Sequence, residues 1–233
     1  MLGLLATGVV GTRVGLAQSE QFADANESAS GFAVMAEHYG AGESAPHRVA
    51  VPTSQADALT AQLETVPGIE RVTPVGQTSD GWSVIDAVGS AEPESDAAFD
   101  EVRALRSAAT ATAPEALVGG TSATALDVRD DSFRDLAVIA PVILAVVLVV
   151  LVVLLRSLVA PFVLLAANLL STMAAIGLGL WVGGALFDIP ALDVTVPLLA
   201  FLFLVALGVD YTIFLVHRAR HEAAEHGLSL IHI

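Results

Sequence analysis

Three stretches in the last hundred residues are apolar over lengths that suit a membrane crossing. Leu136–Leu155 holds no charged residue and is followed by Arg156, and two more apolar stretches lie within 158–182 and 194–217. About 20 apolar residues in a helix cross the ~30 Å hydrocarbon core of a bilayer. Because the connections are short, we expect three transmembrane helices, at 136–156, 158–182 and 194–217, each antiparallel to the next.

Residues 18–135 carry a different pattern, in which helical and strand periods alternate. Side chains alternate from Trp82 to Val88 as in a strand, whereas Phe99, Val102 and Leu105 recur at helical spacing. The expected order is a helix near Ser30–His38, a strand at Arg48–Val51, a helix at Ser54–Thr65, strands at Ile69–Pro74 and Trp82–Val88, a helix at Asp96–Ala108 and a strand at Ala116–Gly119. This βαββαβ order predicts an α+β domain of the ferredoxin-like type, with helices behind an antiparallel sheet.

The N-terminal residues 1–17 admit two interpretations. The apolar Met1–Val10 resembles the core of a signal peptide, with Gly15-Leu16-Ala17 as a cleavage site. A signal peptide begins with positive charge, however, and here Arg13 follows the apolar run. We therefore favour the second interpretation, in which 1–17 is the remnant of a transmembrane helix.

Charge separates the two parts of the chain. Between Gln18 and Asp135 there are 20 acidic residues and 6 arginines, which accounts for nearly all of the net charge of −15. The domain therefore faces water, and its sign excludes nucleic acid as a partner, since phosphate binding needs clustered cations. The chain has neither lysine nor cysteine, which excludes disulfides and a thiolate nucleophile.

We find no metal, cofactor or catalytic motif in the acidic domain. His38 and His47 are isolated histidines without metal-ligand spacing, so we expect both at the surface. The acidic residues Glu92, Glu94 and Asp96 suit a solvated helix start. The stretch 119–122 (GGTS) lacks the lysine of a phosphate loop, and we expect a strand-to-helix turn there.

The distribution of cations predicts the orientation. Two crossings separate Arg156 from the group His217, Arg218 and Arg220, so both lie on one side, which the positive-inside rule makes cytoplasmic. Residues 18–135 are then extracytoplasmic and the segment 218–233 is a cytoplasmic tail. The expected location is the plasma membrane, crossed several times.

The third apolar stretch contains Asp210 and Tyr211. Asp210 lies seven residues before His217, so its carboxyl is roughly 10 Å inside the span. A central aspartate costs about 2.5–3.5 kcal/mol on insertion scales, and intramembrane carboxylates therefore mark ion or proton pathways. The other interpretation is that Asp210 lies near enough to the end of the span to reach water, but its side chain is too short to extend that far.

Small and polar residues share one face of the second span. Asn168, Ser171 and Thr172 recur at helical spacing, and Gly177 lies further along the helix. Such residues pack helices closely in lipid, and Gly208 serves the same purpose next to Asp210. An alternative use is that Asn168 or Ser171 supports the relay by hydrogen bonding toward Asp210.

Residues 154–227, above all 155–161 (LRSLVAP) and 206–218 (ALGVDYTIFLVHR), resemble the MMPL family of lipid exporters in the RND superfamily. The resemblance implies one half of a transporter, with an extracytoplasmic porter-like domain and a fourth helix that carries an Asp-Tyr pair. The segment most resembles the C-terminal half of actinobacterial members. It implies export of lipids or other hydrophobic compounds driven by the proton-motive force, with Asp210 and Tyr211 as the proton relay.

The resemblance also implies what the chain lacks. Two helices of this half and the whole other half would be partners from outside this sequence. Residues 228–233 (LSLIHI) break the charged pattern before them and resemble adapter read-through, so we expect a truncated reading frame.

Two other classes of function compete with export. An intramembrane aspartyl protease needs two carboxylates that share a proton, and the spans of this chain hold one aspartate. The stronger alternative is a membrane-anchored extracytoplasmic domain that binds lipid or protein without transport.

Overall fold

The computed structural model describes residues 2–9, 13–17, 20, 27–187, 189 and 191–226. The expectation about residues 228–233 lies outside this range. The chain divides into two compact units: an α/β unit, Val14–Asp131, and a helical unit formed by Met1–Arg13 and Ser132–Ile233.

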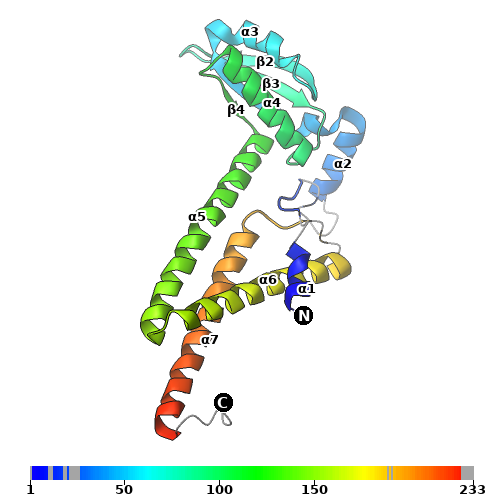
Figure 1. Ribbon diagram of the computed structural model, residues 1–233. Coiled ribbons are helices and arrows are strands. Elements are labelled where there is room, and N and C mark those ends of the chain that lie inside the picture. Colours follow the sequence, from blue (N-terminus) through cyan, green and yellow to red (C-terminus); the bar gives the residue numbers. More distant parts are fainter. Residues whose placement is uncertain are drawn as a thin grey trace. The chain divides into compact units, whose positions relative to one another are not determined.

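The α/β unit is built on a four-stranded antiparallel sheet (Figure 1). Its strands are β1 (His47–Pro52), β2 (Ile69–Gln77), β3 (Trp82–Gly89) and β4 (Leu117–Gly119), in the spatial order β2-β3-β1-β4. Helix α3 (Ala56–Leu63) connects β1 to β2, and α4 (Asp96–Thr112) connects β3 to β4. The expected βαββαβ order and the antiparallel sheet are therefore confirmed, with strand and helix bounds shifted by a few residues.

The core of this unit lies between the sheet and helices α3 and α4. Strand β1 alternates, with Val49 and Val51 fully buried, and these side chains pack with Leu59, Leu63 and Leu105 from the helices. Each buried aliphatic side chain contributes about 1.5–3 kcal/mol of hydrophobic stabilisation.

Local chemistry sets the ends of these elements. Gly81 adopts a φ of 85° in the tight turn between β2 and β3, which suits glycine. The Ser95 hydroxyl accepts a hydrogen bond from the Ala98 amide and so caps α4. Strand β4 ends at Gly119, Gly120 has a φ of 108°, and the next helix begins at Thr121. The predicted strand-to-helix turn at 119–122 is confirmed.

Shorter helical segments precede the sheet. Helix α2 (Glu27–Tyr39) matches the helix expected near Ser30–His38, and the 3-10 segment η3 (Ala41–Ser44) follows it. A second 3-10 segment, η4 (Thr53–Gln55), leads from β1 into α3.

The helical unit contains the long apolar helices (Figure 1). Among the described residues, three helices are long and apolar enough to cross a membrane: α5 (Thr121–Leu155), α6 (Val159–Phe187) and α7 (Val196–His226), whose apolar part ends at Leu215. The first 11 residues of α5 belong to the α/β unit. Large apolar side chains remain exposed along all three helices, as suits side chains that face lipid.

The connections between these helices are short and have defined geometry. Arg156 follows α5 with a left-handed φ of 48°, and its amide donates to the Val152 carbonyl at 2.9 Å. Before α7, the Asp193 carboxylate accepts hydrogen bonds from the amide and the hydroxyl of Thr195, at 2.8 and 2.6 Å. These bonds lower the pKa of Asp193.

The N-terminal segment packs on α6. It consists of helix α1 (Leu2–Ala6) and the 3-10 turn η1 (Thr7–Val9). A Cβ atom added at Gly177 would collide with the Leu5 carbonyl, and one added at Gly8 would collide with the Gly177 carbonyl. The two backbones therefore touch at glycine, a contact typical of helices packed in lipid.

Candidate functional site

The candidate site lies on α7, around Asp210. Both Asp210 and Tyr211 are exposed, and Tyr211 leaves 74% of its surface uncovered. Successive residues of a helix project about 100° apart, so the two side chains leave α7 in different directions. Asp210 and Tyr211 can therefore contact two different neighbouring surfaces at the same time.

An open hollow of about 550 Å³ borders the carboxylate. Its walls are side chains of α7, namely Leu207, Asp210, Tyr211, Ile213 and Phe214. Four of these five residues are apolar or aromatic, so Asp210 is the charged group of an otherwise hydrophobic surface. A carboxyl in such a place can exchange a proton with water or with a polar group that a neighbouring helix brings to it.

Asn168 of α6 reaches the backbone of α7 five residues before Asp210. Its Nδ2 donates a long hydrogen bond to the Val205 carbonyl, at 3.4 Å. A Cβ atom at Gly208 would collide with the Asn168 amide, so glycine is what allows the two helices to approach here. The amide of Asn168 thus lies against Gly208 and bonds the helix backbone.

The other polar residues of this region take different positions. Ser171 is exposed on α6, whereas Thr172 is buried and its hydroxyl has no hydrogen-bond partner among the described residues. On α7, the Thr212 hydroxyl donates to the Gly208 carbonyl at 2.7 Å. The structure therefore brings Asn168 to the backbone beside Asp210, and leaves Ser171 on an exposed surface.

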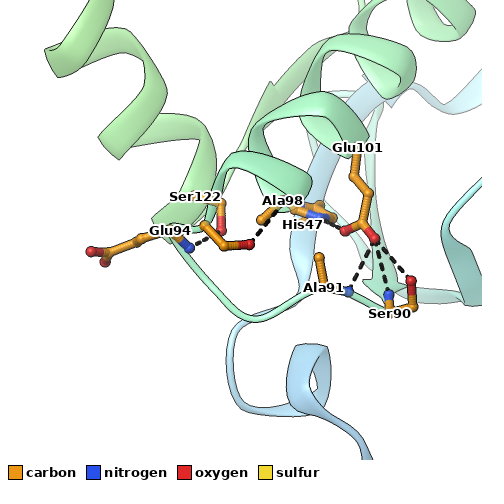
Figure 2. A network of polar contacts seen from close by, with 8 residues as sticks. His47, Ser90, Ala91, Glu94, Ala98, Glu101 and Ser122 are labelled. Carbon is orange, nitrogen blue, oxygen red and sulfur yellow. Dashed lines mark hydrogen bonds and ion pairs between the residues drawn. The ribbon is translucent and has the colours of Figure 1, made fainter. Parts of the chain in front are cut away.

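A second polar cluster, centred on His47 and Glu101, is buried in the α/β unit. The two side chains are 4% and 7% exposed, and His47 Nε2 lies 3.1 Å from Glu101 Oε2. The other carboxylate oxygen accepts from the Ser90 amide and hydroxyl and from the Ala91 amide, at 3.1–3.2 Å (Figure 2). These hydrogen bonds hold the start of the loop between β3 and α4 against helix α4.

The expectation that His47 lies at the surface is wrong, although His38 is exposed as expected. His47 occupies the same face of β1 as Val49 and Val51, and this alternation was the signal that it points inward. Glu101 likewise falls in the buried stripe of α4, between Ala98 and Leu105. The pairing itself joins residues 54 positions apart, so no local pattern reveals it.

Neighbouring glycines make room for the His47 and Glu101 side chains. A Cβ atom at Gly89 would collide with the Glu101 carboxylate, and one at Gly68 would crowd the same side chain. Among the described residues no group of three or more His, Cys, Asp or Glu side chains could hold a metal ion. The arrangement is that of a structural hydrogen-bond network.

These observations define a membrane protein whose described residues include three long apolar helices, an antiparallel α/β unit and a carboxylate on the third of those helices. The sequence profile of the MMPL family matches residues 16–229, and the chain belongs to that family.

Similar proteins carry names of membrane proteins and exporters. The chain is 42% identical to the putative membrane protein ActII-3 of Streptomyces coelicolor, over 97% of this chain and 32% of that protein. It is 32% identical to the apo-petrobactin exporter of Bacillus anthracis, over 84% of this chain and 28% of that protein. A shorter match, 33% identical over 56% of this chain and 13% of the relative, is to the sulfolipid-1 exporter MmpL8 of Mycobacterium tuberculosis. The chain thus spans about a third of the length of the first of these relatives.

Proposed function

We propose that this chain is part of an exporter that moves lipids or other hydrophobic compounds across the plasma membrane and is driven by the proton-motive force. Asp210 is the proton acceptor of the proposed relay and Tyr211 is its neighbour. In this proposal the chain is a secondary active transporter and forms no covalent intermediate.

The position of Asp210 carries this proposal. A carboxylate on an apolar helix is costly, and an alternately neutral and charged carboxyl is a means of coupling proton entry to a change of conformation. One proton that crosses 100 mV releases about 2.3 kcal/mol. This energy is comparable to the roughly 2.5–3.5 kcal/mol cost of the charged side chain, so each protonation can shift a two-state equilibrium of the helices appreciably.

The substrate class is supported by the relatives. One is named for export of sulfolipid-1 and another for export of apo-petrobactin. The hollow beside Asp210 is mostly apolar, which is compatible with a hydrophobic environment on that side of α7. In the proposal, a second half of the transporter faces Tyr211 and completes the pathway.

The α/β unit is, in this proposal, the extracytoplasmic porter-like domain. Its βαββαβ order and its strand order β2-β3-β1-β4 support this assignment. The short α5–α6 connection carries Arg156, which the positive-inside rule places in the cytoplasm. The C-terminal end of α7 would then be cytoplasmic as well.

The test is Asp210→Asn in a full-length MMPL protein that carries this sequence. Asparagine keeps the shape of the side chain and removes its proton exchange, so export should fall to background while the amount of protein in the membrane is unchanged. Export is measured as the release of ¹⁴C-labelled lipid and other hydrophobic compounds from cells grown on labelled acetate. Asp193→Asn, in the loop before α7, is the matched control and should export normally.

Unchanged export by Asp210→Asn would refute the relay. Loss of export by both variants would indicate a general defect of α7 rather than a role for the carboxyl. If the unmodified protein releases no labelled compound above background, the membrane-anchored binding domain becomes the better explanation.

A further inference from the structure

Two backbone carbonyls of α7 that precede Asp210, those of Val205 and Gly208, accept an extra hydrogen bond from a side chain. In an α-helix the Val205 carbonyl accepts from the amide of residue 209, and the Gly208 carbonyl accepts from that of residue 212. Here Val205 also receives Asn168 Nδ2, and Gly208 also receives the Thr212 hydroxyl. A carbonyl has two lone pairs, so it can accept both donors.

A carbonyl that accepts both donors holds the helix amide less strongly. Side chains that insert in this way bend helices or loosen the local hydrogen bond. The two affected bonds end at residues 209 and 212, which flank Asp210 on either side. A bend in this turn would change the direction in which the Asp210 carboxyl leaves α7.

Of the two donors, Asn168 comes from another helix. Thr212 belongs to α7 and moves with it, whereas Asn168 moves with α6. Burial of an amide in an apolar environment without a hydrogen-bond partner costs several kcal/mol. This cost favours conformations in which the Asn168 amide keeps its hydrogen bond to the α7 backbone. A displacement of α6 would thus change the hydrogen bonding of the turn that carries Asp210.

Gly208 determines how close this contact is. A Cβ atom at residue 208 would collide with the oxygen, carbon and nitrogen of the Asn168 amide. Alanine at residue 208 should therefore push Asn168 off the Val205 carbonyl without changing any polar group.

We infer that Asn168 is a positioning residue that acts through the α7 backbone at Val205 and Gly208 to set the placement of the Asp210 carboxyl. The inference rests on the proposed function, because its effect is on the proton step. It differs from the sequence hypothesis that Asn168 hydrogen bonds toward Asp210.

The test measures proton entry in proteoliposomes that contain the full-length MMPL protein. The vesicles are made of phosphatidylcholine and phosphatidylglycerol and trap the pH-sensitive dye pyranine, and a potassium gradient with valinomycin sets the membrane potential. Asn168→Leu keeps the approximate shape of the side chain and removes the donor. We expect a fall of about 10-fold or more in the maximal rate, since small displacements of a reacting group have effects of this size, and a shift in the pH at half-maximal rate.

Gly208→Ala tests the same contact from the other helix, which guards against a folding defect in one variant. It should reproduce the slower rate and the altered pH profile. Because both changes break one contact, Asn168→Ala combined with Gly208→Ala should be no slower than the slower of the single variants Asn168→Ala and Gly208→Ala. Leu170→Ala, on an exposed part of α6, should keep the rate and pH profile of the unmodified protein.

The outcomes separate this inference from the proposed function. If Asp210→Asn stops proton entry but Asn168→Leu leaves the rate and pH profile unchanged, the relay stands and the positioning role is refuted. If the losses of the two single variants multiply in the double variant, the residues act independently and the inference also fails. If Asp210→Asn leaves proton entry intact, the proposed function itself fails.

Discussion

Glu101 shows how a single buried carboxylate organises the α/β unit. It accepts bonds from the Ser90 hydroxyl and the Ala91 amide and lies beside the buried His47, so its loss would leave His47 Nε2 and the Ala91 amide without this partner. An unsatisfied buried donor costs about 1–3 kcal/mol. The stability of the loop between β3 and α4 therefore depends on one side chain of α4.

We predict that Glu101→Ala lowers the free energy of unfolding of the α/β unit by about 2–4 kcal/mol. Unfolding in urea can be followed by Trp82 fluorescence in the detergent-solubilised chain, with Trp181 replaced by phenylalanine. The neighbouring Asp100 is exposed and pairs with Arg103 at the surface, so Asp100→Ala should change stability by no more than about 0.5 kcal/mol. Equal effects of the two substitutions would contradict the role of the buried network.

At the scale of single elements, two ion pairs join the first turns of α5 to α4. Arg106 contacts Asp127 through two hydrogen bonds of 2.6 and 2.8 Å, and Arg129 contacts Asp96 at 2.6 Å. The Arg129 guanidinium also lies 4.6 Å from the centre of the Phe99 ring. These contacts fix the start of α5 within the α/β unit.

The Arg106–Asp127 pair predicts that the folding stability of the α/β unit depends on pH. Hydrogen bonds from Arg106 lower the pKa of Asp127 from its ordinary value of 3.8. A carboxylate with a lowered pKa in the folded state adds stability above the unfolded value, and this stability is lost as the pH falls through the folded value. Because both side chains are accessible to water, we expect the contribution to be below about 1 kcal/mol.

The measurement is urea unfolding at pH 7 and pH 3, for the unmodified chain and for Asp127→Asn. The substitution should reduce stability at pH 7 and have a smaller effect at pH 3, where the pair is being lost. The exposed Asp57 on α3 provides the control for loss of an acidic charge, and Asp57→Asn should change stability at pH 7 by no more than about 0.5 kcal/mol. A constant effect of Asp127→Asn at both pH values would rule out this linkage.

Elements were easier to predict from the sequence than contacts between them. The turn at Ser79-Asp80-Gly81 and the alternation in β3 depend on neighbouring residues, so the strands and their order could be predicted. Asp210 was found because a charge in an apolar run is visible locally. The contacts of Asn168 with Gly208 and of His47 with Glu101 join residues that are far apart in the sequence. Hydrophobic periodicity describes one segment at a time, so it could not predict these contacts.

At the scale of the whole molecule, the topology can be tested directly because the chain has no cysteine. Single cysteines can be introduced at Ser79, in the exposed turn between β2 and β3, and at Arg218, which is exposed near the end of α7. We predict that an impermeant maleimide labels residue 79 on intact cells and labels residue 218 after the membrane is permeabilised. The reverse pattern would contradict the proposed orientation.

The turn at Arg156 combines two properties that usually belong to different residues. Its left-handed backbone is a conformation that glycine adopts at little cost, yet the residue here is an arginine. The same residue is thus both a bend in the chain and a positive charge between two apolar helices. Glycine at this position would keep the bend, relieve its backbone strain and delete the charge, so the bend and the positive charge between the two helices are physically separable.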